Sequence, residues 1–270
     1  MTPSRVRAPS RGAAELAELL RRSERAVALT GAGVSVPSGI PDFRSPGTGL
    51  WRKVNPMEVA HIDAFRRDPE RFWSFYGDRF ATLSDKRPNR AHDALAELER
   101  RDILRAVVTQ NIDRLHRAAG SRRVVEVHGS IEWSVCLECG ARVELERVLT
   151  LLHAGQRPPL CDGCERPLKP DVVLFGELLP EDAMAEAQAL AAEADLMLCV
   201  GSSLEVYPVA ALPEISLARG GALAIVTQGP TAYDHRAVVR LDGDVAEELA
   251  DVVAALDGAA ESATCGGGLP

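Results

Sequence analysis

Two pairs of cysteines carry the clearest chemical signal in this sequence. Cys136 and Cys139 form one Cys-x-x-Cys pair, and Cys161 and Cys164 form a second. Each pair can make a tight knuckle that offers two thiolates, and four thiolates suit a tetrahedral zinc ion. Two disulfides or free thiols are the alternatives, but a chain without an export signal favours metal. Because four protein ligands leave no position for water, we expect one structural zinc and not a catalytic one.

A second group of candidate residues lies where short apolar runs end. Gly31 and Gly33 follow an apolar run at 26–30 and match the start of a phosphate-binding turn. Val36 stands where the third glycine of the dinucleotide fingerprint would fall, and no acidic residue follows about 20 positions on, so a hydride-transfer dehydrogenase is poorly supported. Other polar clusters follow apolar runs at 109–116, 127–130, 175–177 and 201–204. Open α/β sheets bind ligands at the carboxyl ends of their strands, so these clusters predict one shared cleft.

The apolar runs themselves predict an α/β fold. Buried strands are expected at 26–30, 103–108, 124–127, 172–175, 196–200 and 223–226, and helices at 13–22, 91–100, 182–193 and 245–256. Strands that alternate with helices predict a Rossmann-like parallel sheet covered on both faces. Two segments interrupt this pattern, one aromatic and charged, the other bearing the cysteine pairs. They predict a smaller lobe made of a helical insertion and a zinc ribbon.

The expected domain division is therefore discontinuous. A nucleotide-binding domain would comprise residues 13–45, 85–128 and 171–256, with a helical, cofactor-loop insertion at 46–84, a zinc ribbon at 129–170, and flexible tails at 1–12 and 257–270. The 270 residues include 31 basic and 39 acidic side chains, and a net charge of −8 disfavours binding to a phosphate backbone but permits a lysine-rich peptide. No stretch approaches the ~20 apolar residues of a membrane span. We expect a cytoplasmic monomer that binds neither nucleic acid nor membranes.

Seven blocks, in order, resemble those of the sirtuin family of NAD-dependent protein deacylases. They are Gly-Ala-Gly-Val-Ser at 31–35, Gly-Ile-Pro-Asp-Phe-Arg at 39–44, Thr-Gln-Asn-Ile-Asp at 109–113, His-Gly-Ser at 128–130, the cysteine pairs, Phe-Gly-Glu at 175–177 and Gly-Ser-Ser-Leu at 201–204. The resemblance covers residues 13–256. It implies that the chain uses NAD to remove acyl groups, acetyl first, from protein lysines, and releases nicotinamide and O-acyl-ADP-ribose.

The resemblance also assigns roles to individual residues. His128 would be the general base, a task that suits a side chain with an ordinary pKa of ~6.5; by position alone it would be an ordinary turn histidine. Asn111 would orient the ribose and a water, and Asp113 would accept the amide hydrogens of nicotinamide. The other cofactor contacts would come from Gly31, Ala32, Gly33, Phe43, Arg44, Gln110, Ile112, Gly201, Ser202, Ser203, Thr227 and Val245. Ser202 and Ser203 would bind phosphate at a strand-to-helix turn, and Thr227 stands where the family usually has an asparagine.

The acyl-peptide is expected to lie between the two lobes as an added strand. By the same resemblance, Phe175, Gly176 and Glu177 would pair with it, and Val173 and Phe175 would line a tunnel for the acyl-lysine. Tyr76 and Arg79 resemble the pair with which some family members hold a succinyl or malonyl group; the alternative is two ordinary helix residues. Deacetylation ranks first and acidic deacylation second. Protein mono-ADP-ribosylation and a non-enzymatic binding module are further alternatives.

Two other histidines receive structural interpretations. His92 is expected to begin a helix behind a cap at Asn89. His116, one turn beyond Asp113, is expected to have a structural packing role.

Overall fold

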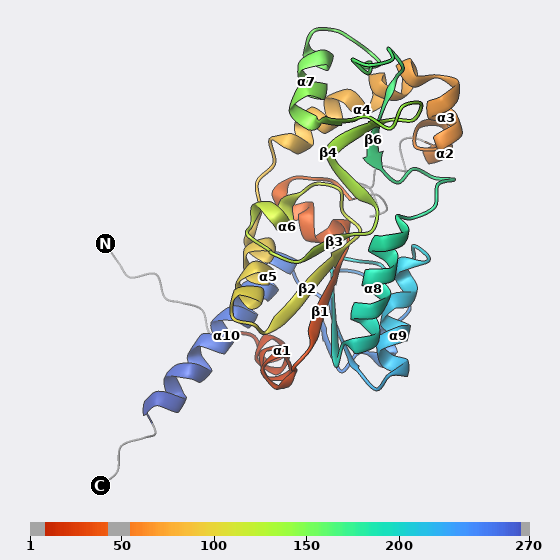
Figure 1. Cartoon of the computed structure of the whole chain (residues 1–270). Coiled ribbons are helices and arrows are strands. Elements are labelled where there is room, and N and C mark those ends of the chain that lie inside the picture. The colour runs from red at the N-terminus through yellow and green to blue at the C-terminus, as the bar shows by residue number, and fades with distance from the viewer. Residues whose placement is uncertain (1–8, 43–54, 266–270) are drawn as a thin grey trace, which may run out of the picture.

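A six-stranded sheet forms the centre of the larger part of the molecule (Figure 1). The computed structural model describes residues 9–42 and 55–265, with side chains up to residue 258. All neighbouring strands are parallel, in the order β3-β2-β1-β7-β8-β9. Their bounds are β1 Ala26–Thr30, β2 Leu104–Thr109, β3 Val124–Glu126, β7 Leu196–Val200, β8 Ala222–Val226 and β9 Val239–Leu241. Because the order reverses at β1, between β2 and β7, the crevice at the carboxyl ends of these strands is where such a sheet binds ligands.

Helices cover both faces of this sheet. One face packs against α1 (Arg11–Arg22), α5 (Arg90–Arg100) and α10 (Val245–Cys265), and the other against α8 (Glu181–Glu193) and α9 (Leu212–Ala218). Strand β1 shows the reason, since Ala26 and Ala28 join the first apolar core and Val27 and Leu29 join the second. Short helical turns lie in the connections, namely η1 (Ala32–Ser38), α6 (Leu115–Ala118), η3 (Val209–Ala211) and η4 (Asp234–Arg236). The predicted α/β fold class is confirmed.

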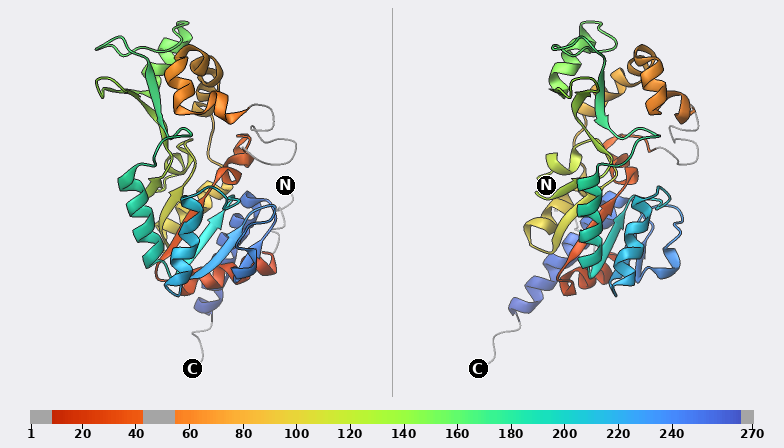
Figure 2. Two further views of the ribbon diagram at one scale, coloured as in Figure 1. Left: turned by 90° about the vertical axis from the view of Figure 1, so that its right-hand side faces the viewer. Right: turned by 45° about the vertical axis from the view of Figure 1, so that its right-hand side comes forward.

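A smaller lobe lies above the carboxyl edge of the sheet (Figure 2). It contains α2 (Pro56–Val59), α3 (Ile62–Arg67), α4 (Pro69–Ser84), α7 (Leu145–His153) and an antiparallel sheet of β5 (Arg142–Glu144), β4 (Gly129–Cys136) and β6 (Leu168–Val172). This lobe has its own apolar core, in which Trp73 and Phe80 pack with residues of the small sheet. The Trp73 indole also donates a hydrogen bond to the Leu168 carbonyl at 2.8 Å, which ties the helical insertion to β6.

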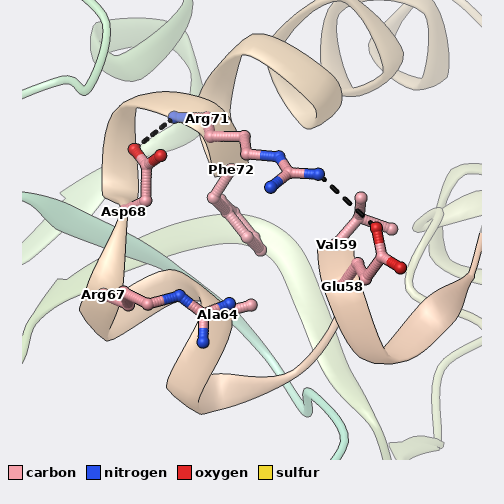
Figure 3. A pocket seen from close by; sticks show the side chains of 7 residues that line it. All are labelled: Glu58, Val59, Ala64, Arg67, Asp68, Arg71 and Phe72. Carbon is pink, nitrogen blue, oxygen red and sulfur yellow. Dashed lines mark hydrogen bonds and ion pairs between the residues drawn. The ribbon is translucent and has the colours of Figure 1, made fainter.

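A small cavity lies within the helical insertion (Figure 3). In it, the Arg71 guanidinium lies 3.5 Å from the Glu58 carboxylate, and Asp68 caps α4 by accepting from the Arg71 amide at 2.9 Å. The residues that line it are Glu58, Val59, Ala64, Arg67, Asp68, Arg71 and Phe72. None of the residues that the sequence singles out for catalysis, cofactor or substrate contact belongs to this lining, so the cavity is separate from the strand ends.

Two expectations about the elements are wrong. The run 172–175 is not a strand of the parallel sheet, because β6 ends at Val172 and pairs antiparallel with β4. An apolar run shows that a segment is buried but not which sheet it joins, and here it packs on the core of the smaller lobe. Helix α10 continues past Leu256, the expected end of this helix, to Cys265; alanines favour helix there. Among the described residues, no helix is long and apolar enough to cross a membrane.

Candidate active site and zinc centre

The loops after β1 and β7 touch each other through backbone at the point where the strand order reverses. The Gly31 amide donates to the Val200 carbonyl at 3.1 Å, and the Gly33 amide to the Gly201 carbonyl at 2.8 Å. A Cβ on Gly33 would lie 2.7 Å from the Gly201 Cα, and one on Gly201, whose φ is +60°, would lie 2.2 Å from the Val34 nitrogen. Glycine is therefore required at 33 and 201, because the two loops meet backbone to backbone there. Together with Gly31 and Ala32, these residues form the glycine cradle that the sequence predicts for a pyrophosphate.

Polar side chains from the neighbouring strand complete this crevice. Gln110, just after β2, donates its side-chain amide to the Ser202 hydroxyl at 3.0 Å, and its backbone amide to the Thr30 carbonyl at 3.0 Å. Ser202 is only 6% exposed. The expected strand-to-helix turn at Ser202 and Ser203 is wrong, because the chain leaves β7 as a loop and η3 begins only at Val209. Phosphate contacts from these serines would come from loop hydroxyls and amides.

A buried hydrogen-bonded group lies beneath the cradle. Asn111 donates from its side-chain nitrogen to the Gly31 carbonyl and to the Ser35 hydroxyl, both at 3.1 Å. Ser35 in turn donates to the Asp113 carboxylate at 2.6 Å. Burial raises the pKa of Asp113 above its ordinary value, and hydrogen bonds from Ser35 and the Leu115 amide oppose that rise. The structure thus brings Asn111 and Asp113 together in a fixed geometry, and Ser35, which belongs to the first sequence block but had no assigned role, joins them.

Two buried histidines form the floor of this group. The rings of His92 and His116 lie 4.8 Å apart between centroids. Burial lowers the pKa of His92 to about 4, and burial together with the nearby His92 lowers the pKa of His116 to about 3, so both rings are neutral at pH 7. The cap of Asn89 on the helix of His92 and the structural packing of His116 are confirmed.

The sequence reasoning missed what these two histidines touch. His92 Nε2 lies 3.4 Å from the Ser35 hydroxyl, and His116 Nε2 lies 2.9 Å from the Thr30 hydroxyl, which donates to Thr109 at 2.8 Å. No local pattern in the sequence signals these contacts, because the partners come from separate segments of the chain.

His128 presents one ring nitrogen as a base. It follows β3 and is half-buried, and its Nδ1 lies 2.9 Å from the Gln110 carbonyl. A carbonyl can only accept a hydrogen bond, so Nδ1 carries the proton and Nε2 keeps its lone pair. Burial lowers the pKa of His128, and the bond to the Gln110 carbonyl partly opposes this. The ring is therefore neutral at pH 7 and able to take up a proton.

The segment predicted to contact substrate lies beside His128. The Val173 amide donates to the His128 carbonyl at 2.8 Å. Phe175 is held by the helical insertion, since its amide donates to the Ala60 carbonyl at 2.9 Å and its carbonyl accepts from the Ile62 amide at 3.0 Å. Gly176 has a φ of +84°, and a Cβ there would lie 2.6 Å from His61 Nε2. Phe175 is 41% exposed, so this turn presents an apolar ring at the junction of the two lobes.

Tyr76 and Arg79 lie on α4 in the smaller lobe. Tyr76 packs against the apolar core that also contacts Ile112, and its ring stacks on Phe80 with centroids 5.4 Å apart. Burial raises the pKa of Tyr76 to about 12, although the charge of Arg79 opposes this. The Arg79 guanidinium lies 3.7 Å from the centroid of the Phe75 ring and donates to the Phe75 carbonyl. Arg79 therefore already has partners on its own helix.

Four of the predicted cofactor residues lie elsewhere or cannot be placed. Thr227 follows β8, is 6% exposed, and donates its amide to the Leu241 carbonyl at 3.0 Å. Val245 begins α10 and packs into the apolar core under the sheet. Phe43 and Arg44 lie outside the described residues.

The four paired cysteines meet at the far end of the smaller lobe. Their sulfurs all lie within 4.8 Å of one another, with sulfur–sulfur distances of 3.4 Å for Cys136–Cys164 and 3.7 Å for both Cys139–Cys161 and Cys164–Cys139. A tetrahedral zinc with Zn–S bonds of about 2.3 Å needs sulfurs about 3.8 Å apart, so this donor set fits zinc. β4 runs from Gly129, next to His128, to Cys136, and at about 3.3 Å per residue it spans roughly 23 Å. The zinc is structural, since it cannot reach the ring of His128.

Comparison with known proteins identifies the family. The sequence model of the Sir2 family matches residues 31–208. The chain belongs to the Sir2 family. A Sir2 relative from Thermotoga maritima, an NAD-dependent protein deacetylase, is 45% identical over 86% of this chain and 94% of its own. A second, an NAD-dependent protein deacylase from Pyrococcus furiosus, is 44% identical over 88% and 96%. A solved Sir2 structure with a p53 peptide and NAD+ is 42% identical, covers 91% of this chain and 98% of its own, and gives a TM-score of 0.83.

Proposed function

We propose that this protein is an NAD-dependent deacylase of protein lysine side chains, with acetyl-lysine as its first substrate. The observation that carries the proposal is the neutral His128, whose Nε2 keeps a free lone pair beside the glycine cradle and the Asn111–Asp113 group. Sir2 relatives are NAD-dependent protein deacetylases and deacylases, and one solved Sir2 structure binds an acetylated peptide. The residues and the relatives agree on one reaction.

The residues of the crevice have different roles in the proposed reaction. When bound, NAD supplies a ribose that loses nicotinamide and accepts the acyl group. The glycine cradle leaves room for the pyrophosphate, and Gln110 and Ser202, already bonded to each other, offer polar groups beside it. Asn111 is held by Gly31 and Ser35 so that it can orient a ribose hydroxyl, and Asp113 can accept from the nicotinamide amide. His128 takes up the hydroxyl proton at Nε2.

The peptide is recognised mainly through backbone in this proposal. The turn at Phe175, Gly176 and Glu177 is clamped to the helical insertion, and it offers an ordered edge with which an extended peptide can pair. Val173, bonded to the carbonyl of His128, and Phe175 would line the acyl chain. Ile112, which contacts the core of the smaller lobe, would line the nicotinamide pocket. Backbone pairing reads little sequence, so we expect broad peptide tolerance. The free thiols at the zinc site fit a reducing compartment such as the cytoplasm, where we propose that the protein acts as a monomer.

Acetyl is ranked above succinyl and malonyl because of Arg79. Recognition of an acidic acyl group would use the guanidinium as a fork for a carboxylate. In this structure the guanidinium covers the Phe75 ring and donates to the Phe75 carbonyl, and Tyr76 is partly buried against Phe72 and Phe80. An acidic acyl chain would first have to displace these contacts.

The test is a product analysis with matched peptides. The protein is incubated with NAD and either an acetyl-lysine or a succinyl-lysine peptide of the same sequence, and products are identified by mass spectrometry. We expect free lysine peptide, nicotinamide and O-acetyl-ADP-ribose, with a lower rate on the succinyl peptide. ADP-ribose attached to protein with no lysine release would contradict deacylation. A succinyl rate above the acetyl rate that falls in Arg79→Ala would contradict the acyl ranking.

A further inference from the structure

The segment between β6 and α8 is tied at both ends to one buried ammonium group. Lys169 lies on β6 and is 4% exposed. Its Nζ donates to the Val172 carbonyl at 2.8 Å and to the Pro170 carbonyl at 3.1 Å, and it lies 3.0 Å from the Glu177 carboxylate. An ammonium has three donors, and three acceptors meet them here. The charge is therefore both paired and hydrogen-bonded, which is the condition under which a lysine is found buried.

These contacts bracket the residues proposed to meet the peptide. Val172 stands at the start of the segment and Glu177 at its end, with Val173 and Phe175 between them. The same oxygen of Glu177 that faces Lys169 also accepts from the Leu174 amide at 2.9 Å, so the carboxylate closes the turn from within. The outer sides of the segment are held by His128 and by the helical insertion. Lys169 supplies a further constraint, from the side of the zinc ribbon.

The position of Lys169 in the small sheet links this constraint to the zinc centre. In the register of β4 with β6, Cys136 pairs with Leu168 and Val135 pairs with Lys169. The lysine is therefore one residue along the ladder from a zinc ligand. Its side chain reaches the opposite way along the strand, toward the turn that ends at Glu177.

We propose that Lys169 is a positioning residue for the peptide, which holds the turn at residues 173–177 in the conformation that pairs with the substrate backbone. The inference rests on the proposed deacylase function. It concerns peptide affinity and not the chemical step, because no reacting group touches the ammonium. Loss of the lysine charge removes its contacts with the Glu177 carboxylate and the Val172 carbonyl together, so both ends of the turn lose this tie.

Steady-state kinetics of variants test this proposal. Lys169→Met removes the charge but keeps an unbranched side chain. We expect the KM for an acetyl-lysine peptide to rise about tenfold, with kcat and the KM for NAD unchanged. This combination is the signature of weaker peptide binding without a change in the chemical step. Glu177→Gln, at a side chain that is 24% exposed, should raise the peptide KM similarly and serves as well if Lys169→Met folds poorly. The double variant should have the same peptide KM as Lys169→Met, because both substitutions break the same Lys169–Glu177 contact.

A matched control lies two residues away on the same strand. Asp171 pairs with Arg142 at 2.9 Å, but both side chains are about half exposed, at 46% and 54%. Asp171→Asn should leave the peptide KM unchanged. The inference is overturned if Lys169→Met and Glu177→Gln keep the wild-type peptide KM, if their effects add, or if Asp171→Asn matches them.

Two further outcomes separate this proposal from its alternatives. A fall in zinc content together with losses in kcat and in the affinity for NAD would show a merely structural role for Lys169 and would also overturn the inference. If the wild-type protein releases no lysine, the proposed function fails first and this inference fails with it. A wild-type enzyme that turns over, with variants that do not change the peptide KM, refutes the role of Lys169 alone.

Discussion

The two buried histidines make a quantitative prediction about acid stability. The pKa of His92 is about 4 and that of His116 about 3 in the folded chain, against about 6.5 when unfolded. Between these folded and unfolded pKa values the unfolded chain binds more protons than the folded chain. The contribution to stability is therefore fully present above pH 6.5 and is lost as the pH falls toward the pKa values of the folded chain. Each histidine contributes a slope of about 1.4 kcal/mol per pH unit. Between pH 7 and pH 5 we expect each to remove about 2 kcal/mol, and about 4 kcal/mol together.

The assay is urea unfolding at a series of pH values between 7 and 5. Asp113, whose pKa burial raises, faces the same cluster through Ser35 and titrates with the opposite sign, so the effect of one histidine is read as a difference between variants. His116→Gln should reduce the pH slope of the unfolding free energy by about 1.4 kcal/mol per unit below pH 6. His235→Gln, at an exposed ring, is the control for replacing an imidazole by an amide. Parallel profiles for His116→Gln and the wild type would refute the reasoning.

Three further changes test the cradle, the zinc centre and the core of the smaller lobe. Gly201→Ala should lower NAD affinity at least tenfold in calorimetric titration, because its Cβ would meet the backbone of Val34. The control Gly220→Ala, at a φ of +87° with open space around it, should leave NAD affinity unchanged. Equal affinities for the two variants would contradict the close packing of the loops at Gly201 and Val34. Chelation of zinc should speed hydrogen exchange across β4, β6 and α7 but not in the large sheet, since Cys136 and Cys161 belong to the core of the smaller lobe; unchanged exchange there would argue against a structural zinc. Trp73→Ala, at a fully buried ring, should cost about 3–5 kcal/mol in urea unfolding, and a loss below about 1 kcal/mol would contradict its place in the core.

The sequence predicted those parts of the fold that depend on local pattern. The strands of the large sheet that begin with Ala26 and Leu196 are continuous apolar runs, which is how a strand buried on both faces reads. The run 172–175 was equally apolar and was assigned to the wrong sheet, because burial alone does not choose between two cores. Strand β9, with three residues, was too short to carry a pattern, and the helix α7 was not predicted.

The site shows the same division between motif and three-dimensional contact. The metal-binding cysteines were predicted from their spacing, since a knuckle is a local structure. Ser35, His92 and His116 join one group from three separate elements, and nothing local in the sequence says that they meet. Lys169 gives an equally clear case, because its partner Glu177 lies beyond a turn whose path depends on the packing of the two lobes. Long-range side-chain contacts of this kind required the folded chain.

The most direct test of the central claim is lysine release by His128→Ala. The wild-type protein and this variant are each incubated with an acetyl-lysine peptide, with and without NAD. The amounts of free lysine peptide and of nicotinamide are then measured. We predict release of both products in equal amounts by the wild type, none of either without NAD, and no lysine release by the variant even though it binds NAD. Lysine release that continues in His128→Ala, or in the complete absence of NAD, would contradict the account.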